Sequence, residues 1–221
     1  MTMVRLERAS KIYRTKHGSV KALDEVNLHI KEGEFAVVRG PSGSGKTTLL
    51  LTLGGMLRPT KGQVLINNSD IYTLSERERS AFRAENIGFV FQLFHLVPYL
   101  NVIDNVLLPA GVGRSRYSQE DANDLLNRLH LTERIYHKPA ELSAGEKQRT
   151  AVARALLKHP RIILADEPTG NLDPENAEEI IRHLAEYHSK GGTVIVVTHG
   201  KAADSYASRI VHLKKGCIDT A

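Results

Sequence analysis

The segment that most constrains this 221-residue chain is Gly40-Pro41-Ser42-Gly43-Ser44-Gly45-Lys46-Thr47. It matches the pattern G-x-x-x-x-G-K-[ST], which is typical of a loop that binds phosphate. In such a loop successive backbone N–H groups surround the phosphate oxygens, and glycines let the backbone approach them closely. Lys46 can reach the β- and γ-phosphates of a nucleotide, and the hydroxyl of Thr47 can ligate Mg²⁺.

The sequence on either side of this loop supports the same interpretation. Phe35–Val38 is a short apolar run that suits one buried strand, and Thr48–Leu53 suits a helix that ends at Gly54-Gly55. Strand, glycine-rich loop and helix follow in the required order, and the positive end of the helix dipole adds to the anion site. The alternative is a plain Gly/Ser turn between a strand and a helix. We assign nucleotide binding to residues 40–48, Thr48 included.

The rest of the chain indicates an α/β fold. Arg161–Ala165 and Thr193–Val197 are almost continuously apolar, as central parallel strands are when both faces are covered. Between them Asp173 is a good N-cap and Pro174 suits the first position of a helix. Strand, helix and strand predict a βαβ unit in a mostly parallel sheet. Residues 1–35 alternate apolar and polar side chains, which favours an antiparallel β part.

Polar residues follow three of the predicted strands. They are Gln92, Asp166-Glu167 and His199. Ligands of open α/β sheets bind at the carboxyl ends of the strands, so these residues and the phosphate loop are expected at one edge. There Asp166 would hold the Mg²⁺ shell, Glu167 would polarise an attacking water, and His199 would stabilise the γ-phosphate or orient Glu167. The alternatives are surface acids and a structural histidine.

A second segment with a phosphate-binding pattern is Leu142–Arg149. Ser143 and Glu146 form a capping box, S-x-x-E, which predicts a helix that starts here and stops at Pro160. The simple interpretation is a capped helix. The sharper one is a second phosphate site, because an exposed helix N-terminus presents N–H donors and positive dipole.

With these residues the chain resembles the ATPase subunits of ABC transporters, and the resemblance covers nearly the whole chain. Leu142–Arg149 is similar to the family signature, usually LSGGQ, although Ala144 replaces its first glycine and Glu146 its final glutamine. Details such as the Glu-containing signature resemble the branch that serves lipoprotein release, macrolide export and cell division. The other matches are Gln92 in the Q-loop, Asn171-Leu172-Asp173 in the D-loop, His199 as the switch histidine and Tyr13 as the aromatic that stacks on adenine.

The resemblance implies an ATPase that uses ATP and Mg²⁺, works as a head-to-tail homodimer and drives a separate integral membrane permease subunit. Each phosphate loop would face Ser143-Ala144-Gly145, with Glu146, of the other copy. The implied catalytic residues are Lys46, Glu167 and His199, and the implied metal-site residues are Thr47, Gln92 and Asp166. The alternative is a non-transport ABC ATPase that transmits force through a membrane partner, as in cell division. A DNA-organising head is disfavoured because no heptad array separates Lys46 from Ser143.

Composition fits a folded domain, with 41% hydrophobic and 25% charged residues. The net charge is +5, but the basic residues are dispersed among acids, so we expect no nucleic-acid partner. No run approaches roughly 18 apolar residues, so we expect no direct membrane insertion. Cys217 is the only cysteine, which excludes an intrachain disulfide, and the histidines lack zinc-site spacing. The N-terminus has no apolar signal-peptide core, so the predicted location is the cytoplasm, and the resemblance implies a peripheral place at the inner face of the cell membrane. The resemblance predicts one ABC ATPase domain over 1–221, with a nucleotide-binding core in about 1–92 and 160–221 and a helical subdomain in about 93–159.

The apolar stretch 93–100, directly after Gln92, allows two interpretations. It is either core of the helical subdomain or a partly exposed groove for a cytoplasmic helix of the membrane subunit. A mixture is expected, since contiguous residues cannot all face inward. We expect one or more of Phe94, Leu96, Val97 and Tyr99 to contact the membrane partner.

Overall fold

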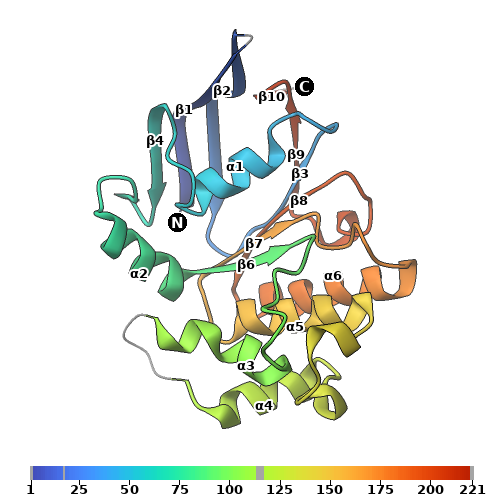
Figure 1. Cartoon of the computed structure of the whole chain (residues 1–221). Helices are drawn as coiled ribbons and strands as arrows, with labels where there is room; N and C mark the ends of the chain where they lie inside the picture. The colour runs from blue at the N-terminus through green and yellow to red at the C-terminus, as the bar shows by residue number, and fades with distance from the viewer. Residues whose placement is uncertain (1, 17, 113–116, 220–221) are drawn as a thin grey trace.

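The computed structural model describes residues 2–16, 18–112 and 117–219, and its centre is a six-stranded sheet (Figure 1). The strand order is β10-β9-β3-β8-β7-β6, with every neighbouring pair parallel except β9 and β10. The register pairs Phe91 with Asp166 and Asp166 with Val197, so the carboxyl ends of these strands align at one edge. The strands are β3 (Phe35–Arg39), β6 (Ile87–Phe91), β7 (Ile162–Asp166), β8 (Thr193–Thr198), β9 (Arg209–Lys214) and β10 (Cys217–Asp219).

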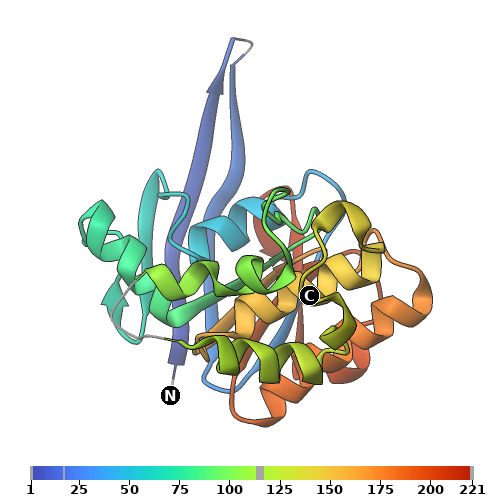
Figure 2. The same cartoon turned by 60° about the horizontal axis from the view of Figure 1, so that its bottom comes forward.

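A second, antiparallel sheet has the order β2-β1-β4-β5. Its strands are β1 (Thr2–Thr15), β2 (Gly18–Lys31), β4 (Lys61–Ile66) and β5 (Ser69–Asp70). The ribbon of β1 and β2 extends well beyond the body of the molecule (Figure 2). The expected antiparallel part is therefore present, and two of its strands come from the predicted segment 1–35.

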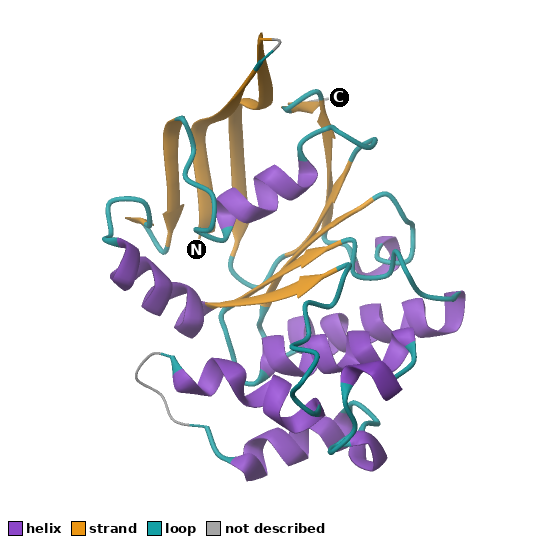
Figure 3. Ribbon diagram, viewed as in Figure 1, coloured by secondary structure: helices purple, strands orange, loops and turns teal. Residues whose placement is uncertain are grey.

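Helices cover both faces of the parallel sheet (Figure 3). Helix α1 (Lys46–Leu53) lies between the two sheets, whereas α5 and α6 cover the opposite face and α3 and α4 pack against α5. Helix α2 (Glu76–Asn86) leads into β6. The remaining bounds are α3 (Val102–Leu107), α4 (Gln119–Arg128), α5 (Ala144–Leu156) and α6 (Pro174–Ser189), with short 3-10 turns at Leu108–Gly111, Thr132–Arg134, Pro139–Glu141 and Asp204–Tyr206.

Two apolar cores follow directly from the alternation of side chains along the central strands. In β3, Ala36 and Val38 pack towards α1 and the antiparallel sheet, while Phe35 and Val37 pack towards α5 and α6. All four are fully buried, as strands covered on both faces must be. The cores hold the central strands rigidly, which fixes the polar residues that follow them.

The local signals in the sequence are confirmed where they were strongest. Asp173 caps α6 by accepting from the N–H of Asn176, and Ser143 and Glu146 form the expected capping box of α5. The helix predicted to start at Thr48 instead begins at Lys46, inside the phosphate loop. Within the described ranges, no helix is both long and apolar enough to cross a bilayer.

Candidate active site

The phosphate loop joins β3 to α1, and its shape depends on glycine at two positions. Gly45 is the N-cap of α1 with φ 104° and ψ 7°, a conformation that L-residues with a side chain rarely adopt. A Cβ at Gly45 would also overlap the carbonyl oxygen of Ala22. At Gly43, φ is 75° and a Cβ would meet no neighbouring atom. Glycine is therefore favoured here by the backbone conformation and not by lack of space. The loop therefore turns tightly onto the N-terminus of α1, where backbone N–H groups can meet an anion.

Lys46 lies beneath this loop with its side chain only 10% exposed. Its Nζ donates to the carbonyl oxygens of Gly40 at 2.8 Å and Pro41 at 3.2 Å. The same atom lies 3.7 Å from Oε1 of Glu167. A fixed positive charge thus sits between the phosphate loop and the carboxylates of the strand ends.

Thr47 and Asp166 bring two side-chain oxygens together at the edge of the sheet. Oγ1 of Thr47 donates to Oδ1 of Asp166 at 3.3 Å. Burial raises the pKa of Asp166 and so does the charge of Glu167, whereas the Thr47 bond and the Lys46 charge lower it. A cation beside this carboxylate would favour its ionised form.

This donor set fits Mg²⁺, which usually takes one or two oxygen ligands from the protein and the rest from water and phosphate. In the ranges 2–16, 18–112 and 117–219, no group of three or more His, Cys, Asp or Glu side chains could hold a metal ion by itself. The protein would therefore supply few of the metal ligands, as expected for a metal that is also bound by nucleotide phosphates.

Glu167 is the most strongly oriented carboxylate of the site. Its Oε2 accepts from Oγ1 of Thr198 at 2.9 Å and from the backbone N–H of His199 at 3.2 Å, and Nδ1 of His199 lies 3.0 Å away. Burial alone would raise the pKa of Glu167, but the bonds from His199 and Thr198 outweigh it and lower the pKa below its usual value. Glu167 is therefore ionised at neutral pH and held in one orientation. Sequence reasoning missed Thr198, although its place beside His199 at a strand end was a usable signal.

Of these groups, Lys46, Thr47, Glu167 and His199 line a cleft of about 600 Å³ at the carboxyl edge of the sheet. His199 reaches it from a mostly exposed position, with 71% of its side chain accessible. Gln92 also lines it, and its backbone oxygen accepts from Nδ2 of Asn171 at 3.0 Å, which ties the Q-loop to the D-loop. Besides Ala22, the lining residues are Ser42, Gly43, Gly45, Lys46, Thr47, Thr48, Gln92, Glu167 and His199.

The predicted signature residues and Tyr13 do not line this cleft. Ser143 and Ala144 are exposed at the N-terminus of α5, whereas Gly145 is buried against the side chain of Asn176. Tyr13 lies on the β1–β2 ribbon with 40% of its surface exposed. The structure therefore brings one half of the expected nucleotide site together and leaves the other half on a separate surface of the same chain.

Glu146, predicted to bind nucleotide, bonds within its own chain. Its Oε1 accepts from Nε of Arg134 at 2.8 Å, and its Oε2 accepts from the N–H of Ser143 at 2.7 Å. The bond from Arg134 outweighs the opposing effect of burial and lowers the pKa of Glu146 to about 2. The carboxylate therefore stabilises the first turn of α5, and a contact with nucleotide stays a prediction.

Residues 23–170 match the family model described as ABC transporter. The chain belongs to the ABC transporter family. This cassette is 42% identical over 219 residues to the lipoprotein-releasing system ATP-binding protein LolD of Bacteroides thetaiotaomicron, covering 98% of this chain and 99% of that protein. It is also 42% identical over 218 residues to the macrolide export ATP-binding/permease protein MacB of Bdellovibrio bacteriovorus, covering 99% of this chain. The cassette spans only 34% of that MacB, about a third of its length.

A solved structure agrees with this assignment. The ATP-binding cassette MJ0796 of Methanocaldococcus jannaschii, in a dimeric post-hydrolysis state bound to ADP and Pi, superimposes with a TM-score of 0.92 at 41% identity. The match covers 98% of this chain and 97% of that chain. The expected ABC-type α/β fold and the assignment as an ATPase of this family are confirmed, while the roles of single residues and the subdomain boundaries stay predictions.

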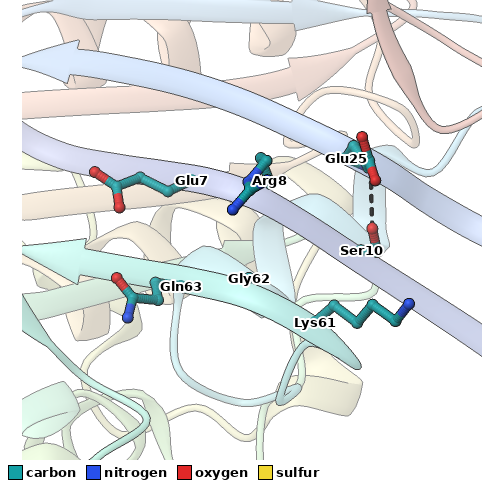
Figure 4. A pocket seen from close by; sticks show the side chains of 7 residues that line it. All are labelled: Glu7, Arg8, Ser10, Glu25, Lys61, Gly62 and Gln63. Carbon is teal, nitrogen blue, oxygen red and sulfur yellow. Dashed lines mark hydrogen bonds between the residues drawn. The ribbon is translucent and has the colours of Figure 1, made fainter.

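A second hollow of the cassette, of about 590 Å³, lies on the antiparallel sheet away from this chemistry (Figure 4). The hollow is lined by two acidic side chains, Glu7 and Glu25, and two basic ones, Arg8 and Lys61, so its formal charges cancel. Its one buried polar side chain, Ser10, already accepts from the N–H of Glu25 at 3.0 Å. With balanced charge and a satisfied hydroxyl, this hollow offers no specific recognition chemistry.

Proposed function

We propose that two copies of this cassette enclose Mg-ATP head to tail and that hydrolysis drives a separate membrane subunit, in lipoprotein release or efflux. The observation that carries the proposal is the division of the site. The cleft is lined by Lys46, Thr47 and Glu167, while the exposed N-terminus of α5 with Ser143 lines no part of it. A second copy turned head to tail would supply the missing half, and the dimeric state of MJ0796 supports this arrangement.

Within this site each side chain has a distinct task. Backbone N–H groups of residues 42–47 and Nζ of Lys46 hold the phosphates. Thr47 and Asp166 hold the metal site, and Mg²⁺ there would neutralise charge that develops on the phosphates. Glu167 accepts a proton from the attacking water through the oxygen that Thr198 and His199 leave free. Tyr13, on the projecting ribbon, stacks on the adenine ring.

Ser143 and Ala144 of the opposing copy complete the phosphate shell. In the capping box the N–H of Glu146 donates to the hydroxyl of Ser143. The first N–H groups of α5 have no partner inside the helix. These donors and the positive helix end suit the γ-phosphate, whose charge grows during phosphoryl transfer. Water is excluded when the two surfaces meet, which strengthens every charge interaction at the seam.

The membrane subunit docks beside the Q-loop in this proposal. The stretch 93–100 contains no fully buried residue, and Leu93 and Tyr99 are 69% and 75% exposed. A hollow of about 280 Å³ lies next to it, lined in part by Phe89, Phe91 and His95. Exposed apolar side chains beside a groove suit a cytoplasmic helix of a permease. The complex would place the cassette at the inner face of the membrane, in the cytoplasm.

The decisive experiment traps the dimer. Glu167→Gln should bind Mg-ATP, hydrolyse it very slowly and run as a dimer by light scattering, while the nucleotide-free protein stays monomeric. Adding Ser143→Arg should abolish the dimer and leave binding of ATP to single cassettes intact, because the arginine fills the space for the γ-phosphate. Ser189→Arg, the same change at an exposed serine that ends α6, is the matched control and should dimerise like its parent. A Ser143→Arg variant that dimerises equally well would rule out the two-sided site.

A further inference from the structure

Gln148, on the second turn of α5, links the signature helix to the loop that carries Glu167. Its side chain is 0% exposed, and its Nε2 donates to the carbonyl oxygen of Pro168 at 2.7 Å. Pro168 directly follows Glu167 in the chain. Helix α5, whose N-terminus is exposed, is thus hydrogen-bonded inside the protein to the backbone next to Glu167.

The amide of Gln148 can adopt only one orientation at this contact. Its partner atom is a carbonyl oxygen, which accepts and cannot donate, so the nitrogen must face Pro168. The other end, Oε1, is then buried with no hydrogen-bond partner in the described parts of the chain. A buried acceptor without a partner destabilises a fold, and an apolar side chain of this size would pack without that cost. The contact with Pro168 is therefore the reason for an amide here.

Asn176 makes a second connection between the same two segments. Its Oδ1 accepts from Nη1 of Arg149 at 3.1 Å and lies against Gly145, where a Cβ would overlap it. Its Nδ2 donates to Oδ2 of Asp173 at 2.7 Å, at the end of the D-loop. Nη1 of Arg149 also donates to Oε2 of Glu179 at 2.6 Å. The first turns of α5 and residues 167–176 are therefore bonded along both sides, which favours their moving together.

We propose that Gln148 is a positioning residue that transmits engagement of the signature to Glu167 of the same chain. The inference rests on the proposed head-to-tail dimer, in which the signature serves the other copy's nucleotide. When Ser143 engages that nucleotide, α5 shifts as a rigid helix and carries the carbonyl of Pro168 with it. Glu167, whose φ of 43° places it in a strained turn closed by the N–H of Gly170, follows. Each site then becomes competent only when its own chain is engaged at the other site.

Gln148→Met tests this coupling, because methionine has nearly the same volume and lacks the amide donor. We expect kcat to fall about ten- to a hundredfold while KM for ATP stays within about twofold, since the phosphate loop is untouched. Thr150→Val is the matched control. Thr150 is also 0% exposed on α5, but its hydroxyl donates to the carbonyl of Glu146 within its own helix. The control should keep the parental kcat even where its melting temperature drops as much as that of Gln148→Met.

A second readout separates coupling from loss of stability. In the Glu167→Gln background, Mg-ATP should increase hydrogen-exchange protection in the peptide covering 166–172, because the loop is fixed once the dimer forms. Adding Gln148→Met should leave dimer formation intact by light scattering and remove that increase. If Glu167→Gln itself never dimerises, the proposed function fails. If the dimer forms and Gln148→Met keeps both kcat and the increase in protection, the dimer stands and the coupling through Gln148 is wrong.

Discussion

The hydroxyl of Thr198 donates a 2.9 Å hydrogen bond to Oε2 of Glu167. The N–H and the imidazole of His199 converge on the same oxygen, while Oε1 is left towards Lys46 at 3.7 Å. One oxygen is thus anchored and the other remains available to a water molecule. In the proposed function, this division would let a single carboxylate be both fixed in direction and active as a base.

The first prediction concerns that base. Glu167→Gln keeps the size of the side chain and removes the proton acceptor, so steady-state hydrolysis should fall about 10²- to 10⁴-fold. Binding of Mg-ATP should change little, because Thr47, Asp166 and Lys46 remain. A coupled ATPase assay and equilibrium nucleotide binding measure the two effects. Near-normal hydrolysis would remove Glu167 from the base role.

The second prediction concerns the pH dependence of that base. Thr198→Val keeps the shape of a strand end that is 3% exposed and removes one donor to Glu167. Burial, which raises the pKa of Glu167, is then opposed by fewer hydrogen bonds, so the pKa must rise. The acid limb of kcat/KM against pH should move to higher pH.

The matched control for this pH profile is Thr193→Val, at the opposite end of the same strand. Thr193 is fully buried, and its hydroxyl accepts from the N–H of Gly33 far from the cleft. Its acid limb should stay at the parental pH. An equal displacement in both variants would mean that loss of strand stability, rather than the bond to Glu167, sets the profile.

Much of the catalytic cleft could be predicted because its residues are strand ends and a contiguous loop. The apolar runs before Asp166 and His199 are long enough to mark buried parallel strands, and parallel register brings their ends together. Capping signals were equally direct, since Ser143 and Asp173 act on residues within three positions. Contacts of this kind join residues that are close in the sequence, so the residue types and their spacing are enough to predict them.

Other contacts could not be predicted, because they join residues far apart in the sequence. The guanidinium of Arg39 pairs with Asp204 and donates to the carbonyl of Gly200, which holds the loop after β8. Gln148 on α5 donates to the carbonyl of Pro168 in a distant loop. No short sequence pattern specifies how this helix and this loop pack together. The sequence also left open which side chains of the stretch 93–100 face inward and which face outward. Arg154 helps to set this by donating to the carbonyl of Phe94.

The third prediction uses the altered signature residue Glu146. Its pKa is lowered from an ordinary 4.5 to about 2, so its contribution to stability is complete above the unfolded pKa and is lost as pH falls towards about 2. Glu146→Gln should lower the free energy of unfolding at pH 7 by about 1–2 kcal/mol, a value reduced because Arg134 is 41% exposed and screened by water.

Urea unfolding at several pH values between about 7 and 3 measures this effect. The gap between Glu146→Gln and its parent should narrow as the pH falls below the unfolded pKa of about 4.5, because the carboxylate of the unfolded parental chain takes up a proton there while that of the folded chain stays ionised. Glu133→Gln removes an exposed acid beside Arg134 and serves as the control, with little change at any pH. A gap that is the same at every pH would show that the ion pair with Arg134 contributes nothing.

The last prediction concerns the docking surface beside the Q-loop. Asn105, which is fully buried, fixes residues 97–101 by accepting from the N–H of Val97 at 2.7 Å and donating to the carbonyl of Leu100 at 3.1 Å. On this rigid loop Tyr99 is 75% exposed, so Tyr99→Asp should leave the melting temperature and ATP binding nearly unchanged. It should nevertheless abolish capture of the membrane subunit in a pull-down, because a charge would be buried without a partner at the interface. Met56→Asp, at a 47% exposed apolar residue between α1 and β4, is the control and should be captured normally. Equal capture of Tyr99→Asp, and of the corresponding changes at Phe94, Leu96 and Val97 that remain folded, would place the permease contact elsewhere on the cassette.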